Sequence, residues 1–376
     1  MKANAENERV KRDYFQYLKE AHGRDEATID GAAKSLARFE DSTGRKSFKR
    51  FHRQQAVAFK KRLADTANAR TGERLSKATM LTTLRELRAF FFWLAHLPGF
   101  KSHIAYADAD YFNLSDKDVA IARARRERPV PAIEQVRSVL AAMPAATALE
   151  RRDRALIAFA LLTGARASAL GSIRLGNVDI VGGYVDQDAR TVRTKARKTF
   201  RSFFLPVDDA ALAIVTEWTA ELSNDHLWGP ADPLFPSTEM GLDPKDGGFT
   251  PVGLARRCWQ GTGPINDVFR RGFAFAGLPY FNPHSFRAML VRHAMALDLR
   301  PEQFKAWSQN LGHANVMTTL TSYGQVPTHR QGELIRSMGQ RGPRGNEPDQ
   351  VVVLEGLIAR MKAGQLPGLP GESRSR

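Results

Sequence analysis

The segment RRDRALIAFALLTGAR, residues 151–166, decides the architecture of the second half of this chain. Its apolar run predicts a helix over residues 151–163 that is buried in a core and ends at Gly164. Arg166 is then expected in a turn just beyond the buried helix. A guanidinium held there can bind two phosphate oxygens at once, which an ammonium cannot do. Taken alone, Arg166 fits an ordinary surface arginine better.

Downstream of this helix, the sequence predicts a mainly helical domain with a small β-sheet. Two short strands at 190–194 and 202–206 form a predicted hairpin, and a loop rich in glycine, proline and aspartate covers 224–250. The helices predicted for this domain cover residues 151–163, 208–222, 264–276, 283–297, 301–310 and 315–323.

Upstream, the sequence predicts a second domain that is wholly helical, over residues 1–115. Helical spacing of apolar residues occurs in ATIDGAAKSLARFEDSTG (27–44), FKRFHRQQAVAFKKRLADT (48–66) and LSKATMLTTLRELRAFFFWLAHLPG (75–99). Ser76 is the expected N-cap of the last helix. The strongly basic faces of these helices are either solvated surface or a surface that contacts DNA.

Residues 116–131 predict a basic linker between the two domains, and residues 132–340 form the second domain. The linker ends near two prolines. Its basic residues either keep the chain soluble or lie beside a phosphate backbone and add to the affinity for DNA. Its candidate DNA-binding residues are Arg123, Arg125, Arg126 and Arg128. Residues 341–376 are a tail in which VVVLEGLIARMKA (351–363) predicts an amphipathic helix. The tail is either mobile or docks on a neighbouring subunit, and we favour docking.

The composition indicates a soluble protein that binds a polyanion. The formal net charge is +16, with 43% hydrophobic and 26% charged residues, and nucleic acid is the commonest polyanion for such a protein. No run of about 18 apolar residues predicts a membrane span, and the charged start MKANAENERV does not resemble a secretory signal. A single cysteine, Cys258, gives neither an internal disulfide nor a metal cluster, so a reducing cytoplasm is expected.

The fragment NPHSFR, residues 282–287, offers two groups that can bind an anion. Asn282 is a good N-cap and Pro283 a good first helical residue, so a helix is expected to begin there. His284 and Arg287 then lie three residues apart on one helix face, near the positive end of the helix dipole. A histidine in this place is also consistent with a capping or core role.

The fragment LGHANVMTTLTSY, residues 311–323, supplies a histidine and a hydroxyl nucleophile. Gly312 permits a tight turn, and His313 is expected to open the next helix. Tyr323 lies ten residues later, or about 15 Å along a straight helix, so a kink or fold-back must bring the two side chains together. A plain core tyrosine is the alternative.

The predicted hairpin supplies a lysine that can act as a general acid. Lys198 lies eight residues before Pro206, and its ammonium can protonate a leaving alkoxide. Lys195, three residues earlier, is the alternative. We favour Lys198.

Taken in chain order, these fragments resemble the tyrosine recombinase family, which includes phage integrases and the Xer proteins that resolve chromosome dimers. The segment TGARASAL resembles the family's first arginine motif, and HxxR, LGH and a later tyrosine follow in order. The layout is similar over residues 9–340, and the specific motifs lie between 163 and 323. The matched residues are Arg166, Lys198, His284, Arg287, His313 and Tyr323.

The resemblance implies a SAM-like helical core-binding domain and a catalytic domain that together clamp double-stranded DNA. The implied activity is site-specific recombination through a 3′-phosphotyrosyl intermediate and a free 5′-hydroxyl, without metal or cofactor. The implied roles are nucleophile for Tyr323, transition-state stabilisation for Arg166, Arg287 and His313, proton donation to the leaving oxygen for Lys198, and assistance in proton transfer for His284.

The implied partners are double-stranded DNA and three further copies of the chain in a tetrameric synapse. A second recombinase or a DNA-bending protein is a possible further partner, and no membrane is expected to be involved. Two departures mark a divergent member. Ala169 stands where many relatives have an acidic residue, and Tyr323 is one residue farther from the LGH histidine than in many of them. Two alternatives remain: an enzyme similar to type IB topoisomerases that relaxes DNA, and a non-catalytic DNA-binding protein of the same fold.

Overall fold

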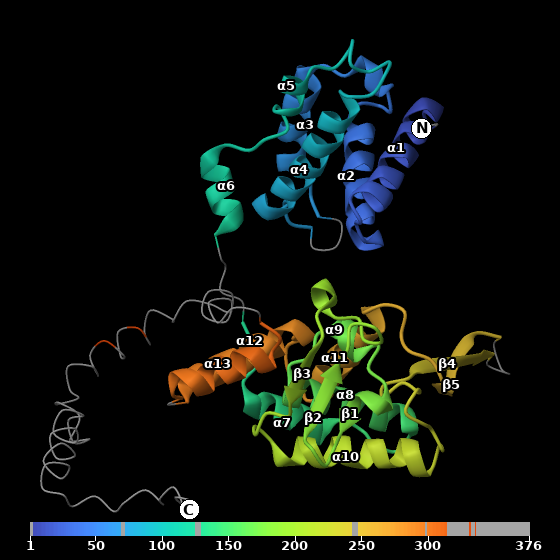
Figure 1. The fold of residues 1–376 in the computed structure, drawn as a ribbon, viewed down its shortest axis with the longest axis vertical. Helices are drawn as coiled ribbons and strands as arrows, with labels where there is room; N and C mark the ends of the chain where they lie inside the picture. The colour runs from blue at the N-terminus through green and yellow to red at the C-terminus, as the bar shows by residue number, and fades with distance from the viewer. Residues whose placement is uncertain are drawn as a thin grey trace, which may run out of the picture. The chain divides into compact units, whose positions relative to one another are not determined.

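The structure is a computed structural model, and it describes residues 3–68, 72–124, 129–242, 247–297 and 299–313, together with residues 331 and 335. The chain divides into two compact units, Met1–Arg126 and Glu127–Arg376, and each has its own hydrophobic core. Figure 1 shows the elements of both units. Within the described residues, no helix is long and apolar enough to cross a membrane. The predicted helices at 315–323 and 351–363 lie outside the described residues.

The first unit is built from helices. Ser76 caps the longest of them as predicted, because its Oγ accepts a hydrogen bond from the N–H of Thr79 at 3.2 Å. The elements in chain order are α1 (Ala5–Gln16), a π-helical turn (Tyr17–Ala21), α2 (Glu26–Ser42), a 3-10 turn (Phe48–Arg50), α3 (Arg53–Asp65), α4 (Lys77–Leu94), α5 (Tyr106–Ala109) and α6 (Asp116–Arg123).

Aromatic rings fill the core of this unit. Phe91 on α4 is fully buried, and its ring centroid lies 4.2 Å from that of Phe51 and 4.9 Å from that of Phe112. Phe39 on α2 packs edge-on against Phe91 at 5.3 Å. Each such pair adds about 0.5–1.5 kcal/mol to the stabilisation that burial alone provides. The first unit therefore has a core of its own.

The segment 116–131, predicted as a linker, begins as a helix of the first unit. Ser115 caps α6 by accepting a hydrogen bond from the N–H of Asp118 at 3.2 Å, and α6 packs against α4. Lys77 of α4 pairs with Asp118 at 2.9 Å. These contacts hold residues 116–123 on the first unit, and the division between the units falls after Arg126.

The second unit is mainly helical with small antiparallel sheets, as predicted. Its elements in chain order are α7 (Ile133–Ala142), α8 (Ala148–Thr163), α9 (Ala167–Leu170), a 3-10 turn (Leu175–Asn177), β1 (Val178–Asp179), β2 (Tyr184–Gln187), a 3-10 turn (Lys195–Arg197), β3 (Phe200–Phe203), α10 (Asp209–Asn224), β4 (Ser237–Leu242), β5 (Phe249–Ala255), α11 (Gly263–Phe275), α12 (Pro283–Ala296) and α13 (Pro301–Asn310).

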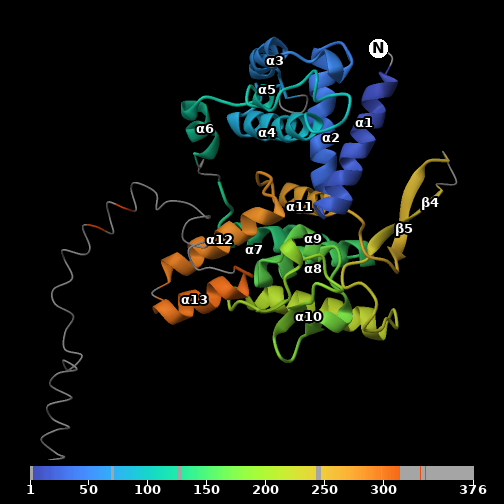
Figure 2. The ribbon, with the colours of Figure 1, turned by 45° about the horizontal axis from the view of Figure 1, so that its top comes forward.

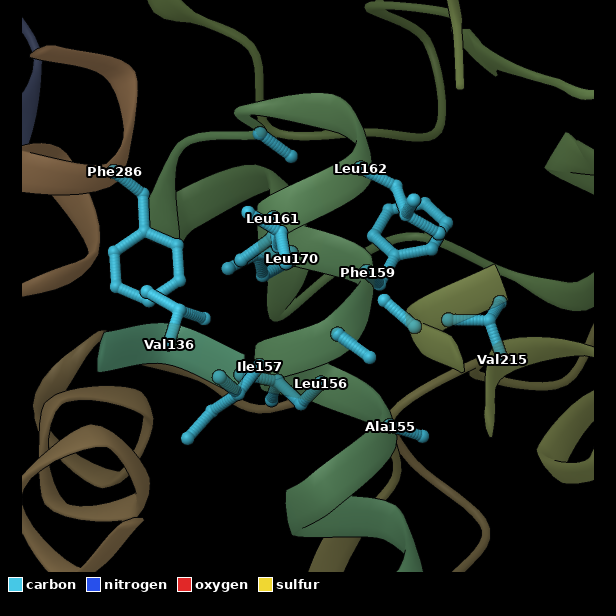
Figure 3. Close-up of a cluster of buried hydrophobic side chains, with 14 of the residues drawn as sticks. Val136, Ala155, Leu156, Ile157, Phe159, Leu161, Leu162, Leu170, Val215 and Phe286 are labelled. Atoms are coloured by element: carbon cyan, nitrogen blue, oxygen red, sulfur yellow. The ribbon is translucent and has the colours of Figure 1, made fainter. Parts of the chain in front are cut away.

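The helix α8 forms the centre of the second unit. Every residue from 155 to 163 is buried, and α8 contacts α7, α10, α11 and α12. Figure 3 shows Phe159 of α8 and Val215 of α10 in one cluster with Phe286 of α12. An apolar run on all sides of a helix is expected when neighbouring elements cover every face. The predicted buried helix is confirmed.

The predicted hairpin exists, but its first strand lies elsewhere and its second strand begins and ends earlier than predicted. The strand predicted at 190–194 is wrong, because the N–H groups of Thr191 and Val192 close a turn on the carbonyl of Asp188, and that of Arg193 bonds to Ser172 Oγ. The first strand is β2, and the second, predicted at 202–206, is β3 at Phe200–Phe203. The sheet order is β1-β2-β3, with Val185 opposite Ser202 and Gln187 opposite Phe200.

The predicted loop 224–250 contains a strand that the sequence pattern did not indicate. The strands β4 and β5 pair antiparallel, with a bulge between Glu239 and Met240, and project from the unit as a ribbon (Figures 1 and 2). Both strands carry exposed apolar side chains, including Leu242 and Phe249. Because most of the ribbon faces away from the core, its sequence lacks the alternation of buried and exposed residues that predicts a strand.

Candidate active site

The chain leaves α8 through Gly164, a position that leaves no room for a side chain. Gly164 has a φ of +59°, and its N–H closes the helix on the carbonyl of Ala160 at 2.9 Å. A Cβ at this position would lie 2.6 Å from Cδ2 of Leu311. Arg166 follows as the half-buried N-cap residue of α9. The predicted turn after α8 is therefore present, and it carries Arg166.

The helix α12 begins where the sequence predicts. Asn282 caps it, with Oδ1 accepting a hydrogen bond from the N–H of Ser285 at 3.2 Å, and Pro283 is the first helical residue. His284 in the first turn is exposed, whereas Arg287, one turn later, is 1% exposed. His284 therefore lies at the helix N-terminus, where the helix dipole favours an anion.

Arg287 joins the ends of three helices. Its Nη1 donates to the carbonyl of Gly164, and its Nη2 donates to the carbonyl of Leu311, each at 2.5 Å. A buried guanidinium needs such acceptors, because an unpaired buried charge is costly. The side chain of Arg287 thus fixes the end of α8 and the end of α13 against α12.

His313 follows α13 through a Schellman turn. The N–H of His313 bonds to the carbonyl of Ser308 at 3.2 Å, and the N–H of Gly312 bonds to the carbonyl of Gln309 at 2.7 Å. Gly312 has a φ of +70°, and a Cβ there would lie 2.6 Å from the ring of Phe200 on β3. The turn leaves His313 at a buried position, 7% exposed.

The imidazole of His313 is neutral at neutral pH. Nη2 of Arg287 lies 3.0 Å from Nε2 of His313, and because a guanidinium can only donate, Nε2 accepts and the proton lies on Nδ1. Burial, and then the charges of Arg287, Arg166, His284 and Lys195, lower the pKa of His313 to about 4. The same charges that repel a proton from His313 attract an anion.

The site residues of the described chain therefore come together from separate segments. The end of α8 brings Arg166, α12 brings His284 and Arg287, and the turn after α13 brings His313. Such an arrangement of fixed donors can stabilise negative charge that develops on a phosphodiester.

The loop 188–199 between β2 and β3 carries both candidate lysines, and both are exposed. Lys195 is the one whose charge contributes to lowering the pKa of His313. It begins a 3-10 turn in which Ala196 and Arg197 have φ values of 57° and 49°. Non-glycine residues seldom adopt this left-handed conformation, and such strain is frequent at functional sites.

One residue that holds this loop had no sequence signal. Arg193 donates to the carbonyl of Gly171 at 3.0 Å, to that of Gln260 at 2.6 Å, and to that of Trp259. The loop is thereby fixed two residues before Lys195. All three acceptors are main-chain groups, which any residue type provides, so no motif could have indicated the contact.

Several predicted residues lie outside the described part of the chain. These are the nucleophile Tyr323 and the linker residues Arg125, Arg126 and Arg128. Arg123 is described, and it is exposed in the last turn of α6.

The chain is similar in sequence to known proteins. A model of the phage integrase family matches residues 132–330. Over 257 residues the chain is 28% identical to tyrosine recombinase XerC of Xylella fastidiosa (strain 9a5c), which covers 68% of this chain and 71% of that protein.

Solved structures show the same fold. A lambda integrase dimer bound to a COC′ core site has a TM-score of 0.55 at 13% identity, over 91% of this chain and 98% of that chain. A lambda integrase tetramer bound to a Holliday junction has a TM-score of 0.52 at 14% identity, over 85% of this chain and 79% of that chain.

Proposed function

The chain belongs to the phage integrase family, whose members are tyrosine recombinases that cut and rejoin DNA, and we propose that its active site is built around His313 with Tyr323 as the nucleophile. The observation that carries this proposal is the contact of the buried Arg287 with His313, with the charges of Arg166, His284 and Lys195 acting on the same imidazole. A phosphodiester is an anion that these groups can hold and polarise.

The reaction exchanges one phosphodiester for another. The hydroxyl oxygen of Tyr323 bonds to the scissile phosphorus, and the bond from phosphorus to the 5′-oxygen breaks, which leaves a 3′-phosphotyrosyl link and a free 5′-hydroxyl. Arg166, Arg287 and the Nδ1–H of His313 stabilise the extra charge of the transition state. His284 assists removal of the tyrosine proton. Because the bond energy is retained in the link, a 5′-hydroxyl of another strand can reverse the step.

The leaving 5′-oxygen takes its proton from a lysine of the loop 188–199. We assign this role to Lys195 rather than to Lys198, which the spacing to Pro206 favoured. The charge of Lys195 acts on His313, and the anchor at Arg193 fixes the chain two residues before it. The flexible side chain of a lysine lets its ammonium move toward the leaving oxygen.

The working assembly is proposed to be a tetramer on double-stranded DNA in the cytoplasm. The lambda integrase tetramer of similar fold is bound to a Holliday junction, and a four-stranded junction matches four active sites. The formal net charge of +16 suits a protein that binds phosphate backbones from more than one side. Arg123, Arg125, Arg126 and Arg128 are proposed to add to this affinity.

Substitution of the nucleophile tests the proposal. Tyr323→Phe is expected to keep specific DNA binding and to lose the covalent adduct on a nicked substrate from which the cut strand diffuses away. The adduct is measured as a band of slower mobility in denaturing gels, on DNA recovered by selection of bound sequences. Tyr280→Phe, which changes an exposed tyrosine, is the matched control and should form the adduct.

An adduct that survives Tyr323→Phe would assign the nucleophile to another residue. Relaxation of supercoiled DNA by the wild-type monomer, without recombination between two sites, would favour the activity of a type IB topoisomerase instead.

A further inference from the structure

Asn310 makes contacts that the proposed reaction does not yet use. It is the last residue of α13 and is 8% exposed. Its Oδ1 accepts a hydrogen bond from the N–H of Phe203 at 2.5 Å, and its Nδ2 donates to the carbonyl of Phe203 at 2.8 Å. One side-chain amide therefore pairs both main-chain groups of a residue on β3, the edge strand of its sheet.

The main chain of Asn310 is held by the same strand. Ser202 Oγ donates to the carbonyl of Asn310 at 2.7 Å, and Gln187 on β2 donates to Ser202 Oγ at 3.0 Å. Ser202 and Gln187 are buried, with 0% and 4% exposed. Buried hydrogen bonds of this kind fix a geometry, because leaving either partner unpaired costs about 1–3 kcal/mol.

The segment 310–313 thus has two sides. On one side Asn310 binds β3, and Gly312 lies against the ring of Phe200. On the other side Leu311 and His313 bind Arg287. The strand β3 follows directly on the loop that carries Lys195, so whatever fixes β3 also fixes one end of that loop.

We propose that Asn310 is a positioning residue that holds β3, and with it the lysine of the loop 188–199, in register with His313. The inference rests on the proposed function of the site. Arg193 fixes the loop before Lys195, and Asn310 fixes the strand after it. Loss of the Asn310 contacts leaves Arg287 with its own acceptors but lets the proton donor move away from the leaving oxygen.

A substrate whose leaving group needs no proton tests this positioning role. Replacing the bridging 5′-oxygen of the scissile phosphate by sulfur gives a leaving thiolate, which departs without a proton because thiols are far more acidic than alcohols. Asn310→Leu, of similar volume, is expected to slow cleavage of ordinary DNA about tenfold or more, a part of what general acid catalysis supplies. On the sulfur substrate it should cleave at close to the wild-type rate.

Reference variants complete the experiment. Lys195→Ala should show the same rescue by sulfur. Gln309→Leu, at an exposed position of the same helix, should leave both rates unchanged. Asn310→Asp keeps an acceptor for the N–H of Phe203 but loses the donor to its carbonyl, so it is expected to fall between wild type and Asn310→Leu.

Equal loss on both substrates, or no loss on either, would overturn the positioning role. If Asn310→Leu does not fold by circular dichroism, Ser202→Ala removes one hydrogen bond to the carbonyl of Asn310 and takes its place in the same comparison, with the same outcomes deciding. Failure of the wild-type protein to form an adduct with either substrate would instead count against the proposed function itself.

Discussion

His313 is neutral first because it is buried and then because positive charge surrounds it, and the second cause couples its protonation to what the site binds. Burial and four neighbouring basic side chains lower its pKa to about 4. A phosphodiester bound among them would offset the positive potential and raise that pKa. DNA binding and proton uptake by His313 are therefore expected to be linked.

The lowered pKa of His313 predicts how the stability of the fold depends on pH. The pKa of His313 is about 4 in the folded protein against 6.5 for an ordinary histidine, so the unfolded chain takes up a proton first as pH falls. The contribution is fully present above pH 6.5, declines as pH falls, and is lost by about pH 4, for a total near 3 kcal/mol. In urea unfolding at pH 7 and pH 4.5, His313→Gln should lose less stability than wild type.

The exposed His103 provides the control for that measurement. His103→Gln should follow the wild-type dependence on pH. A His313→Gln protein that loses as much stability as wild type between the two pH values would mean that other groups carry the effect.

Single substitutions also decide which of the two lysines, Lys195 or Lys198, donates the proton to the leaving oxygen. Lys195→Ala is expected to lower the rate of strand cleavage about 100-fold or more, within the range of general acid catalysis, because no other group replaces the donated proton. Lys198→Ala should retain most activity. Single-turnover adduct formation on the nicked substrate measures both rates. The reverse order of the two effects would return the role to Lys198, as the sequence spacing suggested.

At the scale of elements, the end of α8 contacts two residues of the site region, because Gly164 lies against Arg287 and Leu311. Gly164→Ala combines a left-handed φ, which costs about 1–2 kcal/mol, with a Cβ 2.6 Å from Leu311, and overpacking adds about 1–3 kcal/mol. Gly277→Ala meets the same backbone cost at a φ of +65°, with no atom within 4 Å. The free energy of unfolding should therefore fall more for Gly164→Ala, with loss of cleavage. Equal losses would show that Leu311 yields without cost.

The elements that sequence analysis predicted well are those whose ends have local causes. Asn282 and Pro283 begin α12 where expected, because a cap and a proline act on the adjacent turn. The position of the first hairpin strand was missed, because residues 188–192 form a turn and the N–H of Arg193 bonds to Ser172 on a distant segment. The ribbon β4–β5 was missed, since exposed strands carry no burial pattern.

The candidate site shows the same division. Motifs predicted Arg166 after α8, Arg287 on α12 and His313 after α13, which the fold brings together from separate segments. The contacts that support them involve main-chain groups, which carry no sequence signature. Asn310 binding Phe203 and Arg287 binding Gly164 are of this kind. Ala169, where the resemblance implies an acidic residue, is buried in the core with 1% of its surface exposed and offers no polar group to Arg166.

At the scale of the whole molecule, two separate cores support two units, and we expect both units to contact DNA. Each unit buries its own apolar cluster, so each is expected to fold by itself. The formal net charge of +16 is spread over a chain that is expected to contact DNA from both units. Affinity should then depend on the number of phosphates that both units neutralise together.

Separating the two units tests whether both of them contribute to DNA binding. The piece Glu127–Arg376 is expected to fold and to bind DNA more weakly than the full chain, with a shallower dependence on salt. The logarithm of the binding constant falls by about 0.9 per neutralised phosphate for each tenfold rise in salt, so the difference in slopes counts the phosphates contacted by Met1–Arg126. Titrations at several salt concentrations, with Tyr323→Phe in both proteins to prevent covalent trapping, give both slopes. Identical slopes would place every phosphate contact on the second unit and would leave the basic helices of the first unit as solvated surface.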